Sequence, residues 1–310
     1  MTKLPANDQP TVSIGLAVFN GASYVGEAIE SILGQTWQDL ELIISDNASV
    51  DDSFAICAEY ARHDDRIRLY QNELNVGAAP NFNRMFHLAR GKYFKWAFHD
   101  DVLLPRFLEA TVAVLEADPS VVTCMTRAAR VDERRVRIGE SVTDASWESD
   151  VASERLVGIL REVKRMAIHG VSRVSALERT ALHGSYADSD ANLLAELALL
   201  GRIVVVDEEL YQIRIHSEKS TVKFKNPRER QEFFNTDRLQ RATTPTITSI
   251  ADHLRAIARH EKHLPLRLRY ARIVVFWYLA NRPRAVLGDL RVIAYRFLGR
   301  SGRRSKLVSA

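Results

Sequence analysis

The sequence has little that would mark a secreted, membrane-spanning or disulfide-stabilised protein. Cysteine occurs twice, at Cys57 and Cys124, both in apolar patterns, so a disulfide framework is excluded and buried thiols in a reducing compartment are expected. Residues 1–10 lack a basic region followed by an apolar one, so no secretory signal is expected there, and the segment is predicted to be disordered. The apolar run Ile273 to Ala280 has eight residues, against the ~20 that span a bilayer. These absences predict a cytoplasmic protein.

Two phosphate-binding motifs are also missing. The turn after the first predicted strand reads Asn20-Gly21-Ala22-Ser23, which does not supply the G-x-G-x-x-G of dinucleotide-binding proteins. No G-x-x-x-x-G-K-[ST] segment occurs, and neither an internal repeat nor a low-complexity segment is visible. A nicotinamide-dependent dehydrogenase and a P-loop NTPase are therefore not expected.

What the sequence does contain is an ordinary globular composition with an uneven charge. Of its 310 residues, 46% are hydrophobic and 26% are charged, which suits one large domain or two. Residues 251–310 carry 14 Lys and Arg against 3 Asp and Glu, whereas the first 250 residues carry 29 against 36. A basic tail on an acidic body predicts that the tail meets an anionic surface, either phospholipid or nucleic acid. A solvated helix face is the simpler alternative.

Strand and helix patterns alternate along the first 125 residues. The run Val12 to Phe19 is apolar enough to be buried on both faces, as strands of a parallel sheet are. Further strands are predicted at Leu40 to Ile44, Ile67 to Tyr70, Tyr93 to Phe98 and Val121 to Met125, with amphipathic helices between them. Such alternation predicts a right-handed doubly wound α/β sheet.

The second part of the chain is less regular. Residues 127–165 are charged and have few strong periodicities, which predicts that the segment is partly loop and makes it a candidate mobile lid. After a leucine-rich helix, two short strands are predicted at Ile203 to Val206 and Tyr211 to His216. The last 60 residues are predicted to be helical, with interruptions at Pro265 and Pro283.

Polar side chains stand where several of these strands end. The carboxyl ends of parallel strands meet at one edge of the sheet, where open α/β proteins bind ligands. Asp100 and Asp101 offer hard oxygen ligands that suit Mg²⁺ or Mn²⁺ holding a diphosphate, with capping of the helix near Pro105 as the alternative. The remaining groups could hydrogen-bond a base and a ribose, which describes a nucleotide-sugar site. They are Asn20, Asp46, Asn47 and the Asn75 to Asn83 segment.

The same residues carry a resemblance to a known family. Val12 to Asp51, with Phe19-Asn20 after the first strand and Asp46-Asn47-Ala48-Ser49-Val50-Asp51 after the second, closely resembles the family 2 glycosyltransferases of GT-A fold. Asn75 to Pro105 does so too. A sugar nucleotidyltransferase, which shares the general fold, would carry a glycine-rich, arginine-containing loop after the first strand, and none is present.

The resemblance implies the architecture of the whole chain. It covers about residues 11–220 and implies an α/β fold with a GT-A type doubly wound mixed sheet. A Rossmann-like nucleotide-sugar half would span 11–126, an acceptor half 127–220, and a basic helical extension 221–310.

It also implies which residues hold the donor. Phe19 and Asn20 would lie along the nucleotide, and Asp46 would contact the base, although Asp is also common as a turn residue. Asn75 and Asn81 would line the same pocket. Arg214 resembles a family element that offers a fork of donors to the diphosphate.

The metal motif departs from the family pattern. The usual motif is Asp-x-Asp, and its first Asp falls on Phe98 here. By the resemblance, Asp100 keeps the position expected to bind Mn²⁺ or Mg²⁺, Asp101 is the next carboxylate, and His216 is a further metal contact. His99 is either an additional ligand or a hydrogen-bonded loop histidine.

In inverting members of the family a carboxylate near the acceptor acts as general base. Asp190 matches that place, with Asp188 as the nearby rival and capping of the following helix as the structural alternative. His169-Gly170 is expected to shape the acceptor pocket.

The resemblance thus implies an inverting, metal-assisted hexosyltransferase of the kind that builds cell-envelope polysaccharide. The donor would be a nucleotide diphosphate sugar, with UDP as the first candidate, and the acceptor a hydroxyl of a glycan or a lipid-linked glycan. Because the first Asp of the motif is missing, a non-catalytic nucleotide-sugar-binding protein is the alternative.

The basic C-terminal tail suggests three possible binding partners: a membrane, a second copy of the chain and nucleic acid. Arg267, Arg269 and Arg272 beside Phe276-Trp277-Tyr278 suit a helix lying on an anionic membrane, at the inner face if the protein is cytoplasmic. Packing in a homodimer would explain the aromatic residues equally well. Nucleic-acid binding would explain the charge but not the sugar site, so no nucleic acid is expected.

Overall fold

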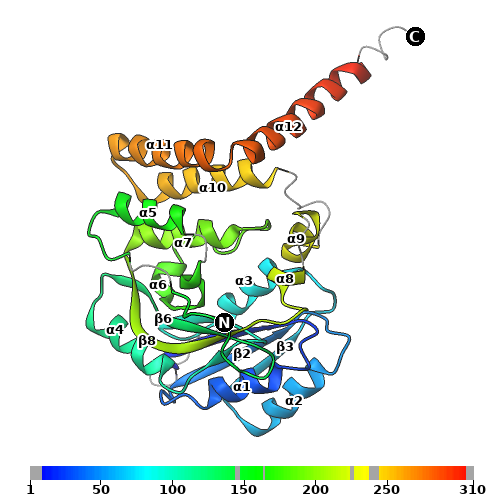
Figure 1. Cartoon of the computed structure of the whole chain (residues 1–310), viewed down its shortest axis with the longest axis vertical. Coiled ribbons are helices and arrows are strands. Elements are labelled where there is room, and N and C mark those ends of the chain that lie inside the picture. The colour runs from blue at the N-terminus through cyan, green and yellow to red at the C-terminus, as the bar shows by residue number, and fades with distance from the viewer. Residues whose placement is uncertain (1–8, 144–146, 163–164, 224–226, 237–243, 305–310) are drawn as a thin grey trace.

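A mixed eight-stranded sheet forms the centre of the protein (Figure 1). The computed structural model describes residues 9–143, 147–162, 165–223, 227–236 and 244–304. The strand order is β3-β2-β1-β4-β7-β6-β8-β5. The strands are β1 (Val12–Val18), β2 (Leu40–Asp46), β3 (Ile67–Gln71), β4 (Tyr93–Phe98), β5 (Val102–Leu103), β6 (Val121–Val131), β7 (Val171–Arg173) and β8 (Arg202–Arg214).

The first half of the chain is the predicted alternation of strands and helices. β1 pairs in parallel with both β2 and β4, and β2 pairs in parallel with β3, so the carboxyl ends of these strands lie at one edge. The six-residue β4 and the seven-residue β1 and β2 are buried almost throughout, which is why they lack polar alternation. The helices between them are α1 (Val25–Leu33), α2 (Ser53–His63), α3 (Ala78–Leu88) and α4 (Phe107–Ala117). The expected doubly wound mixed sheet is confirmed.

The second half contains one long strand where two short ones were predicted. β8 continues through Asp207, Glu208 and Glu209, because its pairing with β6 is adjusted by register shifts around Arg127. The three acids are paired with arginines from neighbouring segments: Asp207 with Arg127 at 3.0 Å, Glu208 with Arg106 at 3.0 Å, and Glu209 with Arg137 at 2.7 Å. A charged run that breaks the apolar pattern therefore does not break this strand.

The segment predicted to be partly loop, 127–165, has more regular structure than its composition indicates. β6 extends to Val131, six residues beyond the predicted end, and Ala128 bridges to Val142. Trp147 is buried and bridges to Ile203, and its indole lies so close to Gly158 that a Cβ there would be 2.2 Å from the ring. Helix α5 (Ala152–Arg161) follows. The segment is thus partly loop, as predicted, but it also contains the end of β6 and helix α5, and residues distant in sequence supply its strand pairing. Its role as a lid stays a prediction.

Short elements connect this segment to the long strand. They are the 3₁₀ helix η2 (Met166–His169), then β7, α6 (Val174–Leu177) and α7 (Ser189–Leu200). β7 is antiparallel to both β4 and β6 and so joins the two halves of the sheet.

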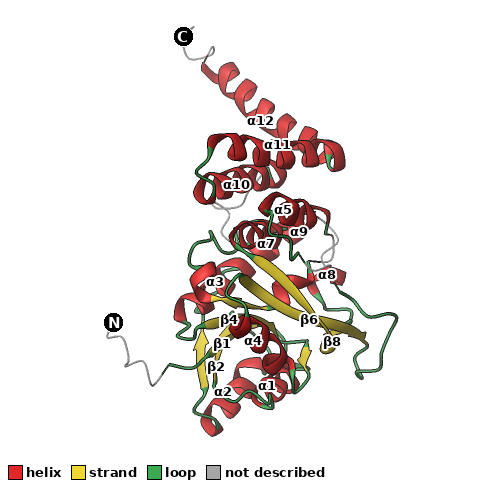
Figure 2. Cartoon of the chain, turned by 90° about the vertical axis from the view of Figure 1, so that its left-hand side faces the viewer, coloured by secondary structure: helices red, strands yellow, loops and turns green. Residues whose placement is uncertain are grey.

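The C-terminal helices form a layer above the sheet domain (Figures 1 and 2). They are α10 (Pro245–His260), α11 (Leu264–Asn281) and α12 (Pro283–Arg304). Two shorter helices before them, α8 (Ser220–Lys223) and α9 (Pro227–Phe234), lie lower, close to the sheet (Figure 1). Buried polar contacts dock α10 on α7: Asn192 Nδ2 lies 2.8 Å from the Ser249 carbonyl oxygen and 2.6 Å from His253 Nδ1, and Glu196 pairs with His260 at 3.2 Å. The first part of the predicted extension is therefore packed on the domain, while α12 projects away from it (Figure 1).

The predicted boundaries at 126 and 220 stay predictions. Of the segment expected to be disordered, residues 1–8 lie outside the described residues. Within the described ranges, none of the helices combines the length and the apolar character that crossing a bilayer requires.

Candidate functional site

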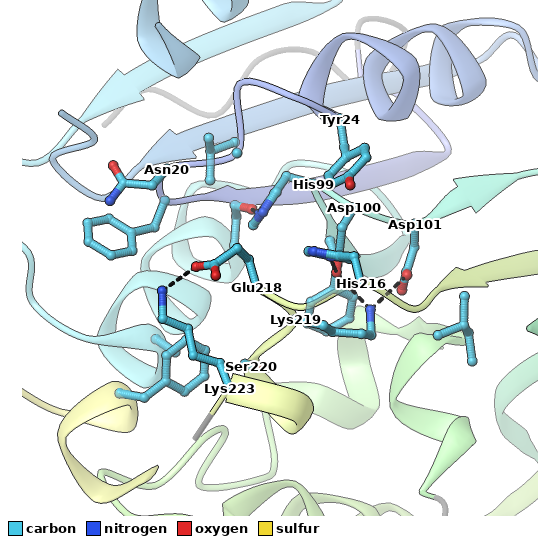
Figure 3. A pocket seen from close by; sticks show the side chains of 18 of the residues that line it. Asn20, Tyr24, His99, Asp100, Asp101, His216, Glu218, Lys219, Ser220 and Lys223 are labelled. Atoms are coloured by element: carbon cyan, nitrogen blue, oxygen red, sulfur yellow. Dashed lines mark hydrogen bonds and ion pairs between the residues drawn. The ribbon is translucent and has the colours of Figure 1, made fainter. Parts of the chain in front are cut away.

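A cavity of about 780 Å³ lies at the carboxyl ends of β1, β2 and β4. Residues after β8 and on α9 close its other side, among them Lys219, Lys223 and Phe233 (Figure 3). Asp190, at the start of α7, and Arg165 line it as well. The cavity thus brings together segments from Ala17 to Phe233, at the edge where the sequence predicted a ligand.

The loop after β1 forms one wall of the cavity. Phe19 is 38% exposed there, which is unusual for a phenylalanine that follows a buried strand. Asn20 has a positive φ of 50°, and its side-chain Oδ1 accepts a hydrogen bond from the Val50 amide at 2.9 Å. The Asn20 amide in turn donates to Ser49 Oγ at 2.9 Å. The loops after β1 and β2 are therefore tied together, and the predicted nucleotide residues Phe19 and Asn20 both line the cavity.

Asp46 lies deeper than the sequence suggested. It is fully buried, and its Oδ2 accepts hydrogen bonds from the Ser49 amide and from Gln71 Nε2, both at 3.1 Å. Its Oδ1 is buried with no hydrogen-bond partner among the described residues. The neighbouring Asn47, and not Asp46, is among the residues that line the cavity. The contact of Asp46 with a base stays a prediction.

Asn75, in the loop after β3, and Asn81, on α3, both form hydrogen bonds inside the protein. Asn75 Oδ1 accepts hydrogen bonds from Asn47 Nδ2 at 3.0 Å and from the Gly77 amide at 2.8 Å. Gly77 has a φ of +87°, and a Cβ on it would lie 2.7 Å from the Asn235 Cα, so this position requires glycine. Asn81 is buried, and its amide bonds to Ser45, with Oδ1 at 2.7 Å from the hydroxyl. Both predicted residues line the cavity, with much of their hydrogen-bonding capacity already used.

The acidic pair after β4 is almost completely enclosed. Asp100 and Asp101 are 7% and 2% exposed. Asp100 Oδ2 lies 3.1 Å from His216 Nε2 and 2.7 Å from Lys219 Nζ. Asp101 Oδ2 accepts a hydrogen bond from the Tyr211 hydroxyl at 2.7 Å, and its Oδ1 lies 3.1 Å from Lys219 Nζ. Lys219 therefore bridges both carboxylates (Figure 3).

The pKa values of the two carboxyl groups are shifted in opposite directions. Burial disfavours the charge of Asp100, but the His216 hydrogen bond and the Lys219 charge outweigh it and hold its pKa below the usual range. Burial raises the pKa of Asp101, helped by the charge of Asp100 and opposed by that of Lys219. Asp100 is thus the better anion of the pair.

The predicted metal ligands fit a metal only in a limited way. Among the described residues, no group of three or more carboxylate, histidine or cysteine side chains is placed to hold an ion. Both carboxylate oxygens of Asp101 already accept hydrogen bonds, from the Tyr211 hydroxyl, from Lys219 Nζ and, at 3.1 Å, from the Arg214 amide. Asp100 and His216 do converge, and one or two protein ligands suffice for Mg²⁺ when substrate phosphates supply the others. The donor set therefore fits a metal held jointly with a diphosphate.

His99 packs against the first loop. A Cβ on Gly21 would come within 2.2 Å of its ring, and its Nδ1 lies 3.4 Å from the Ala17 carbonyl oxygen. Figure 3 shows the ring between Asn20 and Asp100. The close approach of the ring to Gly21 gives that glycine a local role that the sequence pattern did not show.

Arg214 points away from the cavity. It is 2% exposed, and its guanidinium donates to the carbonyl oxygens of Asp100 at 3.1 Å and Glu133 at 2.6 Å, and to the Glu27 carboxylate. It is not among the residues that line the cavity. This geometry does not favour the predicted contact of Arg214 with a diphosphate. Lys219, which was not predicted from the sequence although it lies three residues after His216, is an enclosed cation that faces the cavity beside the acidic pair.

The carboxylates before α7 form a second charged cluster. Arg165 Nη1 lies 2.9 Å from both Asp188 Oδ1 and Asp190 Oδ1. Asp188 also pairs with Arg230 and Arg282, each at 3.2 Å. Burial works against the charge on Asp188, but Arg165 and these partners lower its pKa. Burial raises the pKa of Asp190, and the charge of Asp188 adds to this effect.

The two predicted candidates for the base are therefore distinguishable. Asp190 lines the cavity, whereas Asp188 does not, and both hydrogen bonds that Asp190 accepts from described residues go to Oδ1. His169 lines the cavity near Tyr211, with Nδ1 3.0 Å from the hydroxyl, and burial lowers its pKa. Its predicted role in the acceptor pocket remains a prediction.

Comparison with known proteins decides the family. A family model described as glycosyl transferase family 2 matches residues 13–171, about half of the chain. The chain belongs to glycosyl transferase family 2. EpsE of Bacillus subtilis (strain 168), named as a glycosyltransferase, is 40% identical over 111 residues, which make up 36% of this chain and 40% of EpsE. The chain thus spans less than half the length of this family 2 relative. The predicted membership is confirmed.

Solved structures establish the fold of this family 2 member. The structure of S. aureus TarS 1–349 in complex with UDP-GlcNAc superposes with a TM-score of 0.64 and 14% identity, covering 87% of this chain and 73% of TarS. The mannosyltransferase PcManGT from Pyrobaculum calidifontis, in complex with GDP-Man and Mn²⁺, gives 0.55 and 16%, covering 96% of this chain and 81% of PcManGT. The fold is GT-A, as expected, with a helical C-terminal region.

Proposed function

We propose that this family 2 glycosyltransferase moves a hexose from a nucleotide diphosphate sugar to a hydroxyl group of a glycan or lipid-linked acceptor, with inversion at the anomeric carbon. The observation that carries the proposal is that a carboxylate with a raised pKa, Asp190, and an enclosed cluster of Asp100, His216 and Lys219 line the same cavity. The first suits a base for an acceptor hydroxyl, and the second suits a diphosphate that must leave.

Asp190 is placed to act as the base. Its raised pKa makes it a better proton acceptor than an ordinary aspartate, as long as the pH keeps it ionised. Arg165 holds its Oδ1 in position and also neutralises Asp188, so the two carboxylates have separate tasks. In the reaction Asp190 accepts the proton of the acceptor hydroxyl as that oxygen attacks the anomeric carbon.

The leaving group would be stabilised at the other end of the cavity. Lys219 offers a cation to the departing diphosphate, and Asp100 and His216 are the residues that would hold Mn²⁺ or Mg²⁺. When bound, the metal supplies positive charge to the phosphate oxygens. Enclosure of these groups strengthens each electrostatic contact, because little water competes inside the cavity.

The proposal of a nucleotide sugar as the donor is based on Phe19, Asn20 and Asn47, which form one wall of the cavity. These residues offer an apolar surface and amide groups, which suit a base and a ribose. TarS is described in complex with UDP and with UDP-GlcNAc, and PcManGT with GDP-Man. Because the larger number of these complexes contains uridine, a UDP-sugar is the first donor to test.

A non-catalytic nucleotide-sugar-binding protein is the alternative. It is favoured by Phe98, which stands where the family usually has the first acid of its metal motif. Such a protein would bind the donor without turning it over, and its function would stay intact after Asp190→Asn.

The C-terminal helices support a proposal about the acceptor. Along α11 and α12, large apolar residues and arginines are exposed together, with Leu268, Arg272, Phe276 and Leu279 at helical spacing on one face. Phe276 is 64% exposed. An anionic membrane surface complements both the apolar and the basic character, and it would present a lipid-linked acceptor to a cytoplasmic enzyme at the inner face. A homodimer that covers this face is the competing outcome.

The function is tested with a panel of UDP-, GDP- and dTDP-hexoses. Binding and slow hydrolysis of each donor are measured with Mn²⁺, with Mg²⁺ and with EDTA, on the wild type and on Asp100→Ala. One donor should bind more tightly with metal, and Asp100→Ala should lose that gain. If no nucleotide sugar binds under any of these conditions, the proposed function is wrong.

A further inference from the structure

Lys219 occupies the space between the two carboxylates that the family resemblance assigns to metal and diphosphate binding. Its Nζ lies 2.7 Å from Asp100 Oδ2 and 3.1 Å from Asp101 Oδ1 (Figure 3). The side chain is 13% exposed, whereas that of Lys223 in the same cavity is 49% exposed and pairs with Glu218. Lys219 is therefore enclosed by the site, and Lys223 is a matched lysine outside the acidic pair.

The oxygen that Lys219 contacts is the one that His216 also faces. His216 Nε2 lies 3.1 Å from Asp100 Oδ2, so this oxygen and the imidazole mark the position that a metal would use. An ammonium and a divalent ion cannot share that oxygen without strong repulsion at such short range. Asp101 offers no free replacement, because Tyr211 holds its Oδ2 and Lys219 its Oδ1.

The charge of the cluster leads to the same conclusion. Two carboxylates and one ammonium leave a net charge of −1 in an enclosed site, which a divalent ion would turn positive if Lys219 stayed in place. A diphosphate would compensate for this excess. The stem of lysine is flexible, and the cavity on its open side gives the ammonium space to leave the carboxylates.

We propose that Lys219 is a displaceable counter-cation that competes with the divalent metal for Asp100, so that the metal binds weakly until the nucleotide diphosphate is present. The proposal rests on the donor site of the proposed function. It assigns to Lys219 a role in the order and strength of binding.

The test is Mn²⁺ binding to the full chain without nucleotide, measured by calorimetry at pH 8. Lys219→Met should bind Mn²⁺ about tenfold or more tightly than the wild type, because a positive charge ~4 Å away repels a cation even at an effective dielectric constant of ~20. Lys223→Met should match the wild type. Adding Asp100→Ala to Lys219→Met should remove the gain, which ties it to this site.

A second measurement follows the coupling to nucleotide. UDP should strengthen Mn²⁺ binding to the wild type by a larger factor than to Lys219→Met, since the variant has no ammonium to displace. If Lys219→Met does not show a cooperative thermal transition, Lys219→Gln replaces it, because glutamine can hydrogen-bond the carboxylates without charge.

The proposal is overturned if Mn²⁺ affinity without nucleotide is unchanged or weaker in the neutral variants, or if Lys223→Met gives the same gain. Binding of UDP to the same preparations is recorded separately. A wild type that binds no nucleotide refutes the proposed function, whereas UDP binding with an unchanged Mn²⁺ affinity in Lys219→Met refutes the role of Lys219 alone.

Discussion

Replacement of Asp190 by asparagine separates donor binding from catalysis. Asparagine has the same shape, and its Oδ1 can keep the hydrogen bonds from Arg165 and from the Ala191 amide, both 2.9 Å long. The donor wall comes from other loops, so UDP affinity should stay within about twofold. A general base typically contributes 10²–10⁴-fold, so kcat for transfer should fall by about that factor, or ~3–5 kcal/mol in the activation barrier.

The matched control is Asp188→Asn, which makes the same change two residues away. Asp188 does not line the cavity, so kcat at high pH should fall less than about tenfold. Removing its negative charge removes one cause of the raised pKa of Asp190. The acid limb of the pH–rate profile, where Asp190 becomes protonated and activity is lost, should therefore move to lower pH.

The assay is release of UDP from the identified donor in the presence of acceptor, followed from pH 4 to 9, with UDP binding measured by calorimetry. The assignment is refuted if Asp190→Asn keeps more than about a tenth of the wild-type kcat, since that is less than the smallest usual contribution of a base. An equal loss of kcat in Asp190→Asn and Asp188→Asn would show that catalysis depends on the charged cluster as a whole and not on Asp190 as the base.

Three further outcomes follow from the packing and the surface. Burial lowers the pKa of His183 and His253 to about 4, below the ~6.5 of an unfolded histidine, so stability should be full above pH 6.5 and fall toward pH 4 by up to about 3 kcal/mol per residue. Urea unfolding at pH 7 and 5 measures this, and a smaller pH dependence is expected for His183→Phe. Arg282→Ala, which removes a partly exposed partner of Asp188, should cost less than about 1 kcal/mol by the same urea assay. Phe276→Glu should weaken cosedimentation with phosphatidylglycerol vesicles at least about tenfold, given ~1.5–3 kcal/mol for burying such a side chain, and unchanged binding would count against the membrane proposal.

The strand ends of the first half could be predicted because their signals are local. β1, β2 and β4 are apolar runs that stop at polar residues, and buried parallel strands need no alternation. The parallel order then places Asn20, Asp46 and Asp100 at one edge without further information. The second half was less readable, because β8 crosses three acids that only its arginine partners, distant in sequence, explain.

The positions of the basic side chains around Asp100 and Asp101 could not be predicted from local sequence patterns. Arg214 and His216 alternate with apolar residues, and the resemblance implied that Arg214 contacts the diphosphate and His216 the metal. In the structure, the Arg214 guanidinium donates to the carbonyl oxygens of Asp100 and Glu133. Of the two side chains, His216 is the one that contacts the Asp100 carboxylate. Lys219 reaches it because the chain turns back after His216, where the Lys219 amide donates to the His216 carbonyl oxygen at 3.2 Å. A turn of this kind leaves no periodic pattern in the sequence.

The proposed base and the basic C-terminal helices, which lie far apart in the sequence, are connected in the structure. Arg282 stands between α11 and α12 and contacts Asp188 at 3.2 Å, while Arg165 links Asp188 to Asp190. Three ion pairs therefore connect the face proposed to meet a membrane with the carboxylate proposed to activate the acceptor: Arg282 with Asp188, Asp188 with Arg165, and Arg165 with Asp190. Because Arg282 and Asp188 are both partly exposed, their contact adds little stability, so its effect would be on where the loop before α7 sits. A membrane that shifts α11 and α12 would then act on acceptor positioning and leave unchanged the proposed donor-binding residues Phe19, Asn20 and Asn47, which lie in the loops after β1 and β2.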